Sequence, residues 1–357
     1  MITFLSFIFV IGVVVFIHEL GHFLAAKSVG VRVEKFYIGF NLFGLGWKVD
    51  YKGTEYGIGL FPLGGYVKLA GVIDESMDVQ STGADDEFKS KNTLQKIWIM
   101  SAGVIMNFIL AIFIFSHLTY HTGISEPSSS TIIGGVAPKY PAETLGLQSG
   151  DEIISINGVL VSNWEEMAKN IHSKPNEIIQ ISWERNEQII NGSVQTVIAE
   201  QPLPWNKHIM KGIIGIQPVF THRNITILES FSKGFMQTYF WLEITYKTLL
   251  SLMQGNVSMK EMAGPIMIAK MAGETATTGG FYALLGLMGI ISVNLGLINI
   301  LPIPGLDGGH VFIALIEGII NKEIPLKIKL GIQQIGMLLI LILFFTIMFN
   351  DIQRILQ

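Results

Sequence analysis

Four long apolar stretches divide the chain. They cover residues 2–26, 97–118, 281–300 and 332–349. Each approaches the roughly 20 mostly apolar residues that a helix needs to cross a bilayer. The pattern therefore predicts an α-helical membrane protein with about four transmembrane helices.

A different pattern lies between the first two stretches. Residues 47–51 alternate apolar and polar side chains, Lys52-Gly53 follows as a turn, and 56–60 alternate again. This alternation predicts a β-hairpin. A glycine-containing run comes next, and its glycines permit close backbone approach. Two readings fit this run equally, an ordinary small sheet or an edge strand that pairs with an unwound substrate. Its residues are Gly64, Gly65, Tyr66, Val67 and Lys68.

Residues 122 to about 220 contain strand-like runs and turns but no apolar stretch long enough to span. Within them, G-D-E-I (150–153) and I-N-G (156–158) resemble the core signature of PDZ domains. PDZ domains bind extended peptide ends by strand addition. The alternative is a PDZ fold that binds no peptide and only obstructs access. By analogy, the receiving strand is predicted at Ile132, Ile133, Gly134, Gly135 and Val136.

Composition agrees with a membrane protein that carries one modest soluble domain. Half of the 357 residues are hydrophobic and only 15% are charged. The net charge of −4, without a run of Lys and Arg, argues against a nucleic-acid partner. The absence of cysteine excludes disulfides and thiolate zinc sites. The first apolar stretch lacks a basic leader region, so we interpret it as a retained span.

The first apolar stretch also carries the candidate chemistry. His18, Glu19 and His22 are its only residues that ionise at neutral pH. Residues four apart on a helix share a face, so the two histidines can present ring nitrogens to one metal. Glu19 can take a proton from water, which makes this the H-E-x-x-H arrangement of zinc hydrolases. The alternative is two histidines satisfied by backbone carbonyls, which lipid disfavours.

The third apolar stretch ends in two prolines, an aspartate and two glycines, within 302–309. Proline has no N–H to donate, so the helix stops there. Asp307 is either the N-cap of the next helix or a third metal ligand. A catalytic zinc site uses three protein ligands and leaves a fourth position for water. Beside an intramembrane H-E-x-x-H, the ligand reading is favoured, with one Zn²⁺ per chain.

Other polar residues within the apolar stretches need partners. Asn294 and Asn299 lie five apart, and either substrate backbone or helix packing can satisfy them. Gly103 and Asn107 lie one helical turn apart, and small residues let membrane helices approach closely. Their neighbour is either the metal-bearing helix or another one. His310, one turn after Asp307, is a further candidate ligand.

The motifs together resemble the site-2 protease family, and more closely its bacterial RseP-type intramembrane zinc metalloproteases. The resemblance covers nearly the whole chain in the right order. Two departures are Val104, where the family usually has proline, and room for one PDZ domain where many members carry two. The motifs are H-E-L-G-H (18–22), G-G-Y-V-K (64–68), A-G-V-I-M-N (102–107), the PDZ segment and N-x-x-P-x-P-x-L-D-G-G-H (299–310).

This resemblance implies a polytopic α-helical membrane protein with a membrane-reentrant β element and an inserted α+β PDZ domain. It implies His18, His22 and Asp307 as zinc ligands and Glu19 as the catalytic acid/base. The predicted parts are an N-terminal membrane half (1–121) with a cytoplasmic loop, an extracytoplasmic PDZ domain (122–222), an amphipathic helix and linker (223–280) and a C-terminal membrane half (281–357).

The β element is then expected to guide the substrate through 64–68, and Asn294 and Asn299 to hold the substrate strand. The implied function is an intramembrane zinc endopeptidase whose partners are the bilayer and transmembrane substrates, such as anti-sigma factors or remnant signal peptides. One alternative is a catalytically silent PDZ-bearing binding protein, against which the intact four-residue set argues. A transporter would require inverted repeats, and the sequence shows none.

The distribution of charge predicts an orientation. Lys and Arg are denser in 27–96 and 322–329 than in 122–280. The positive-inside rule then places the PDZ segment outside the cytoplasm. The expected location is the bacterial inner membrane, with the active site in the membrane near the cytoplasmic side.

Overall fold

The structure is a computed structural model of the chain, and it describes all residues except 42–45, 73–82, 203–207 and 357. It forms two compact units. Unit 1 consists of Met1–Thr119 and Ile227–Gln357, and unit 2 of Tyr120–Thr226. The PDZ segment predicted at 122–222 falls inside unit 2, and residues 73–82, between the first two apolar stretches, lie outside the described residues.

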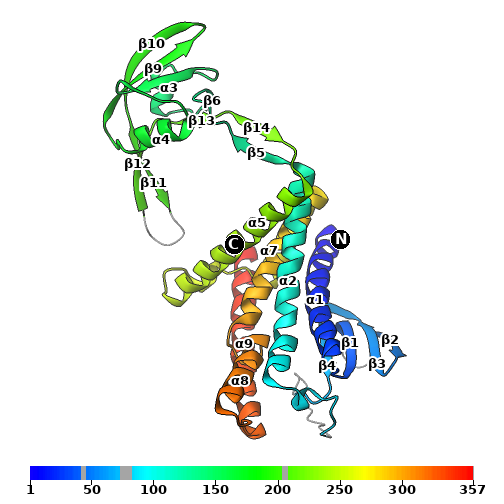
Figure 1. Cartoon of the computed structure of the whole chain (residues 1–357). Helices are drawn as coiled ribbons and strands as arrows, with labels where there is room; N and C mark the ends of the chain where they lie inside the picture. Colours follow the sequence, from blue (N-terminus) through cyan, green and yellow to red (C-terminus); the bar gives the residue numbers. More distant parts are fainter. Residues whose placement is uncertain (42–45, 73–82, 203–207, 357) are drawn as a thin grey trace. The chain divides into compact units, whose positions relative to one another are not determined.

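Unit 1 is a bundle of helices with one small sheet (Figure 1). Among the described residues, four of its helices are long and apolar enough to cross a membrane, in agreement with the four predicted spans. They are α1 (Ile2–Ser28), α2 (Thr93–Thr122), α7 (Gly280–Ile300) and α9 (Leu326–Leu356). Shorter elements are η2 (Phe88–Ser90), η3 (Met259–Glu261), α6 (Pro265–Thr278) and α8 (Asp307–Ile320).

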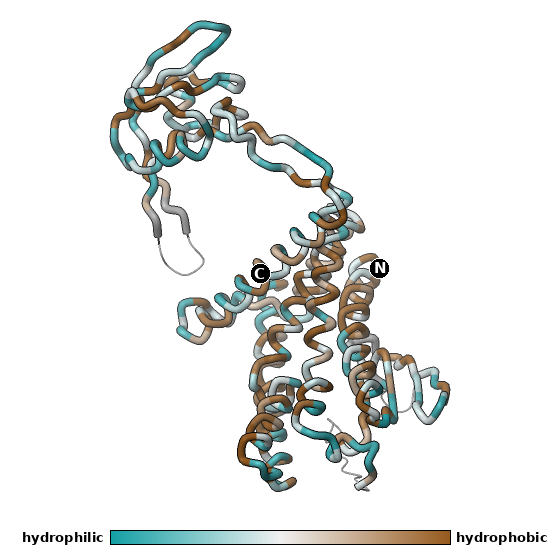
Figure 2. Tube along the Cα trace, in the orientation of Figure 1, coloured by the Kyte–Doolittle hydropathy of each residue, from teal (hydrophilic) through white to brown (hydrophobic). Residues whose placement is uncertain are grey.

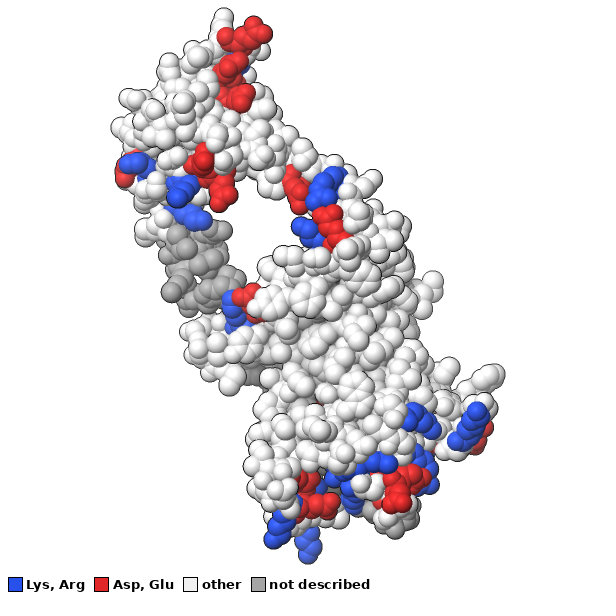
Figure 3. Space-filling model, viewed as in Figure 1, with Lys and Arg blue, Asp and Glu red and all other residues white. Residues whose placement is uncertain are grey.

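The surface of unit 1 follows from this composition. The helices are hydrophobic over most of their length (Figure 2). On the face shown in Figure 3, the middle of the bundle is largely uncharged, and charged side chains gather at the end that holds α8. Large apolar side chains of α9, such as Leu338, Ile342 and Phe345, are exposed. Exposure of that kind suits a lipid solvent.

The sheet of unit 1 has the strand order β2-β3-β1-β4. Its strands are β1 (Val33–Phe40), β2 (Gly46–Tyr51), β3 (Thr54–Gly59) and β4 (Phe61–Leu69). The predicted hairpin is confirmed, because β2 and β3 pair antiparallel around Lys52 and Gly53, whose φ values are 48° and 77°. Positive φ at both central residues is the requirement of a type I′ turn. β4 pairs antiparallel with β1 at one end of the order.

The sheet is anchored to the helices by a shared core. Val31, Val33 and Leu69 are buried against Ala25 and Ala26 of α1. Ile99, Met100 and Ala102 of α2 complete the same cluster. The strands therefore have a fixed position beside the end of α1 that carries the two histidines.

Helix α5 (Ile227–Met253) corresponds to the predicted amphipathic helix and is not among the candidate spans. Its buried residues are small, Ser230, Gly234 and Thr238 at four-residue intervals. A Cβ on Gly234 would lie 2.6 Å from the Ser116 backbone nitrogen, so α5 packs closely on α2. α5 also crosses α7 (Figure 1). Large aromatic residues of α5 such as Phe231, Phe235 and Tyr239 are exposed, as expected where small residues form the helix–helix contact.

Unit 2 is an α+β fold whose main sheet has the order β10-β9-β7-β8. Its core gathers Ile153 and Ile156 of β7 with Ile179, Ile181 and Trp183 of β9. Helices α3 (Pro141–Leu145) and α4 (Trp164–His172) add to this core through Ala142, Met167 and Ile171. The main strands are β7 (Glu152–Ile156), β8 (Val159–Leu160), β9 (Ile178–Arg185) and β10 (Gln188–Gln195).

The remaining strands of unit 2 form three separate pairs. They are β5 (Ile124–Pro127) with β14 (Phe220–Arg223), β6 (Ile133–Val136) with β13 (Ile216–Pro218), and β11 (Val197–Pro202) with β12 (His208–Ile213). The signature Ile156-Asn157-Gly158 forms the tight turn between β7 and β8, with φ of 51° at Asn157 and 76° at Gly158. That turn is the one expected of the sequence motif.

Candidate metal centre

Three ligand atoms converge inside unit 1. The Nε2 atoms of His18 and His22 are 3.2 Å apart. Oδ2 of Asp307 lies 3.0 Å from Nε2 of His18 and 3.2 Å from Nε2 of His22. The histidines are buried, and the side chain of Asp307 is 20% exposed. Among the described residues, these three form the group of His, Asp and Glu side chains that could hold a metal ion.

The spacing of these atoms suits zinc. Ligands at about 2.0–2.1 Å in tetrahedral geometry are separated from one another by roughly 3.3 Å. The three observed separations, 3.0–3.2 Å, are close to that value. Oδ2 of Asp307 is also buried and has no hydrogen-bond partner among the described residues. A metal ion satisfies that oxygen, so the residues present fit one.

Asp307 reaches the histidines through a reversal of the chain between α7 and α8. The competing prediction, Asp307 as the N-cap, is wrong, because the cap is Leu306 and no side-chain capping bond forms there. The two glycines after Asp307 make the reversal possible. A Cβ on Gly308 would lie 2.2 Å from the carbonyl oxygen of Leu301, and one on Gly309 would lie 2.4 Å from that of Ile303.

One face of α2 supports both histidines. The backbone carbonyl of Ile99 accepts a hydrogen bond of 2.8 Å from Nδ1 of His22, which leaves Nε2 of His22 free for a metal. The side-chain amide of Asn107 lies 3.2 Å from Nδ1 of His18. Between them, a Cβ on Gly103 would stand 2.4 Å from Nε2 of His22. Of the two neighbours considered for Gly103 and Asn107, the structure selects the histidine-bearing helix.

Glu19 lies where β4 passes α1. A Cβ on Gly65 would be 3.3 Å from Cγ of Glu19 and 2.8 Å from the backbone oxygen of Tyr37. No larger residue fits between β1 and Glu19 at that point. β4 stands at the end of the strand order, and no described strand pairs with its outer edge. The run 64–68 is therefore an edge strand that passes beside Glu19.

The two asparagines of α7 have different surroundings. Nδ2 of Asn299 lies 3.2 Å from Nε2 of His18, so this amide is part of the centre. Asn294 accepts a hydrogen bond of 2.6 Å from the Thr245 hydroxyl of α5, which is a contact between helices. The structure thus brings Asn299 to the centre and engages Asn294 in helix packing.

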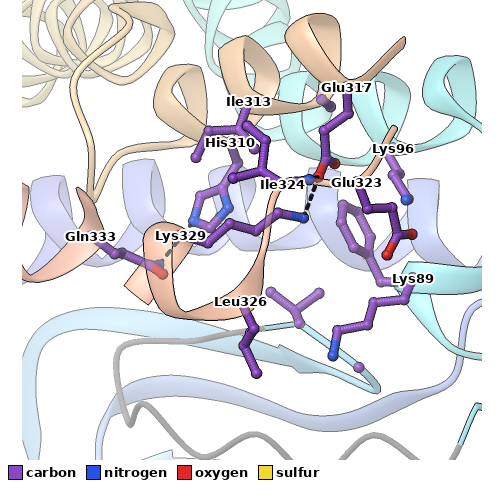
Figure 4. A pocket seen from close by; sticks show the side chains of 14 residues that line it. Lys89, Lys96, His310, Ile313, Glu317, Glu323, Ile324, Leu326, Lys329 and Gln333 are labelled. Atoms are coloured by element: carbon purple, nitrogen blue, oxygen red, sulfur yellow. Dashed lines mark hydrogen bonds and ion pairs between the residues drawn. The ribbon is translucent and has the colours of Figure 1, made fainter. Parts of the chain in front are cut away.

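His310 is not part of the convergent group. Its Nε2 lies 3.2 Å from Nε2 of Gln333 in α9. As Figure 4 shows, its ring lines a pocket of about 140 Å³ together with Lys329 and Glu317, which form an ion pair of 2.6 Å. His310 is therefore a pocket-lining residue beside the centre, and the ligand alternative for it is not supported.

The backbone of the predicted peptide-receiving strand of unit 2, Ile132–Val136, is already partly paired. On one side, β6 pairs antiparallel with β13. On the other side, Ile132 bridges to Glu152, and Ile133 exchanges backbone hydrogen bonds with Gly150 and Asp151. One edge of the strand is thus paired with β13 and the other only at its start, so peptide addition there stays a prediction. A pocket in this unit lies between α4 and residues 213–216.

Sequence reasoning missed the carbonyl of Ile99 and the hydroxyl of Ser292, which donates a hydrogen bond of 2.8 Å to the backbone oxygen of Asn107. A backbone acceptor leaves no signal in a sequence. Ser292 lies seven residues before Asn299, the residue of its own helix that reaches the centre, and belongs to none of the motifs.

Comparison with known proteins adds an independent observation. The family model described as Peptidase family M50 matches residues 6–343. A Rickettsia conorii protein named as a zinc metalloprotease is 34% identical over 99% of this chain and 99% of its own length. A Campylobacter jejuni protein named in the same way is 33% identical over 99% of this chain and 94% of its own. The zinc metalloprotease RasP of Geobacillus kaustophilus is 28% identical over 98% and 97%.

Among solved structures, the chain is similar to the PDZ domain of an SdrC-like protein from Listeria monocytogenes. The similarity covers 27% of this chain and 94% of that domain, at 20% identity and a TM-score of 0.21. A score of that size adds nothing to what the strands of unit 2 already show.

Proposed function

Because this chain belongs to Peptidase family M50, and is thereby an intramembrane zinc protease, we propose that His18, His22 and Asp307 hold its catalytic zinc, one per chain, and that Glu19 is its acid/base. One observation carries this proposal. Three buried or nearly buried ligand atoms lie within 3.2 Å of one another, and two of them belong to the same helix as Glu19, which is able to span a membrane. A binding protein without catalysis has no need of that arrangement.

The proposed role of each group follows from its chemistry. Zinc, when bound, supplies a Lewis acid that polarises the scissile carbonyl and activates a water. The Glu19 carboxylate takes the proton of the attacking water and later gives it to the leaving amine. We propose that Nδ2 of Asn299, which lies 3.2 Å from Nε2 of His18, donates a hydrogen bond to the substrate and helps to hold the substrate strand. Donors fixed in advance in a dry site stabilise developing charge strongly.

We propose transmembrane segments of membrane proteins as the substrates, such as anti-sigma factors or remnant signal peptides. Amides within a helix are shielded by their own hydrogen bonds, so the segment must unwind before attack. Each freed backbone group costs several kcal/mol in lipid. The outer edge of β4, at Gly64–Lys68, offers backbone partners to such a segment directly beside Glu19. Strand addition there compensates the unwinding.

The proposed orientation keeps the charge argument from the sequence. In a bacterial inner membrane, unit 2 is on the extracytoplasmic side, and the metal centre lies in the membrane toward the cytoplasm. We propose that 1–121 and 281–357 form the two halves of the membrane core, that the PDZ segment (122–222) limits or guides access, and that 223–280 links it back. Asn294, held by Thr245, contributes to helix packing and reaches substrate only if that bond opens.

The test uses protein purified in detergent, with zinc content and cleavage of a model transmembrane substrate measured on the same samples. We expect one zinc per chain in the wild type, cleavage lost in Glu19→Gln with zinc retained, and both lost in Asp307→Ala. His310→Ala is the matched control, because His310 is near the centre but not a ligand, and it should retain its zinc. Wild-type protein without zinc would refute the proposed centre. Zinc bound without cleavage of any transmembrane substrate would favour a binding role instead.

A further inference from the structure

Asn107 is a fully buried polar residue in α2, and its environment is incomplete. Its Oδ1 has no hydrogen-bond partner among the described residues. Its Nδ2 lies 3.2 Å from Nδ1 of His18. The contact recorded for this buried amide is therefore with His18, so the role of Asn107 depends on which amide atom faces that ring.

The protonation of His18 decides which amide atom faces the ring. Nε2 of His18 faces the other two ligand atoms, at 3.0 Å and 3.2 Å, and must present a lone pair to a metal. A neutral imidazole carries one N–H, which must then be on Nδ1. An N–H at Nδ1 and an amide NH₂ are both donors and cannot bond to each other. The oxygen and nitrogen of an asparagine amide exchange places by rotation of the amide, and which of the two faces a neighbour follows from the hydrogen bonds.

We infer that Oδ1 of Asn107 accepts the Nδ1–H of His18 and so fixes the metal-binding tautomer of this ligand. His22 shows the same arrangement with an unambiguous acceptor, the carbonyl of Ile99, at 2.8 Å from its Nδ1. Ile99, Gly103 and Asn107 recur at four-residue intervals along α2. One face of this helix therefore presents the Ile99 carbonyl to His22 and the Asn107 amide to His18, with no side chain at Gly103 between them. Asn107 is thus a positioning residue that touches neither substrate nor metal.

The position of Asn107 is itself fixed from α7. The hydroxyl of Ser292, fully buried, donates a hydrogen bond of 2.8 Å to the backbone oxygen of Asn107. This bond holds the main chain of α2 but does not involve the amide. Ser292→Ala is therefore a control that disturbs the same place in the packing and leaves the acceptor for His18 intact.

The inference rests on the proposed zinc site and predicts a specific effect on zinc affinity. Partners of ligating histidines contribute about 10–100-fold to metal affinity. We expect zinc to bind 10–100-fold more weakly to Asn107→Leu and Asn107→Ala, which lack an acceptor. Asn107→Asp keeps an acceptor oxygen and should bind zinc within about threefold of the wild type, as should Ser292→Ala.

The experiment measures zinc affinity of the purified full chain by competition with a chelator of known affinity, together with thermal unfolding of the zinc-free forms. A positioning role predicts similar unfolding of all zinc-free variants, whereas a packing role predicts that the loss appears there too. Wild-type affinity in a folded Leu or Ala variant overturns the inference, and so does an Asp variant as weak as Leu. Absence of zinc from the wild type would instead overturn the proposed function.

Discussion

Replacement of Gly103 by alanine tests how tightly α2 is fitted to the metal centre. The added Cβ would stand 2.4 Å from Nε2 of His22, 2.7 Å from Cε1 of His18 and 2.8 Å from Nδ1 of His18. Ordinary contact begins near 3.4 Å, so the first separation is short by 1.0 Å. The methyl group would therefore lie beside the atom that must face the metal.

Relaxation is difficult at this position. The backbones of α1 and α2 are also in close contact at Gly21, where an added Cβ would lie 2.4 Å from the carbonyl oxygen of Ala102. The remaining responses are to separate the two helices or to rotate the histidines. Overpacking of this kind costs about 1–3 kcal/mol, and a displacement of about 1 Å in a catalytic group costs about 100-fold in rate.

We expect Gly103→Ala to lower kcat/KM by about 100-fold or more and to weaken zinc binding at the same time. Cleavage of a transmembrane substrate and zinc content of the same detergent-purified sample are the measurements. Gly12→Ala is the matched control, because Gly12 is also in a span and no atom lies within 4 Å of its added Cβ. A Gly103→Ala protein with zinc and activity within twofold of the wild type would refute the packing argument.

Three further predictions concern other parts of the chain. Removal of zinc with a chelator should abolish cleavage, and added zinc should restore it, since the His18, His22 and Asp307 group fits a metal; activity unaffected by complete removal would contradict the centre. Asp351→Ala should lower the free energy of unfolding by about 2 kcal/mol, measured by thermal or denaturant unfolding. The Asp351 carboxylate of α9 accepts hydrogen bonds of 3.0–3.1 Å from the backbone N–H groups of Gly264, Ile266 and Met267 and so caps α6. Unchanged stability would show that water replaces the cap. In unit 2, burial raises the pKa of Asp151, but hydrogen bonds from Arg185 and the Gln148 backbone outweigh it and leave that pKa below its usual value. Asp151 therefore stabilises the folded unit above its unfolded pKa near 3.9, and this contribution is lost as pH falls through the lower folded value. Acid unfolding of wild type and Asp151→Asn, followed by tryptophan fluorescence, should differ at neutral pH and converge at low pH, and parallel curves would contradict the assignment.

Much of this protein is determined by local sequence patterns. The four spans follow from runs of apolar residues, which fold as helices wherever lipid leaves no other way to satisfy the backbone. Two tight turns, Lys52-Gly53 and Asn157-Gly158, each contain a glycine at positive φ, and Asn157 is a residue type that also adopts it. The juxtaposition of His18 and His22 follows from the period of the helix alone. Each of these depends only on residues near one another in the chain.

Only the tertiary structure decides which distant groups meet. It brings Asp307 to the two histidines, separates Asn299 at the centre from Asn294 in a helix contact, and pairs one edge of β6 with β13. It also makes the carbonyl of Ile99 the partner of His22. Five residues of spacing cannot distinguish two asparagines on one helix, because their surroundings are supplied by other helices. A backbone acceptor is present at every position of a sequence, so packing alone selects the one that is used.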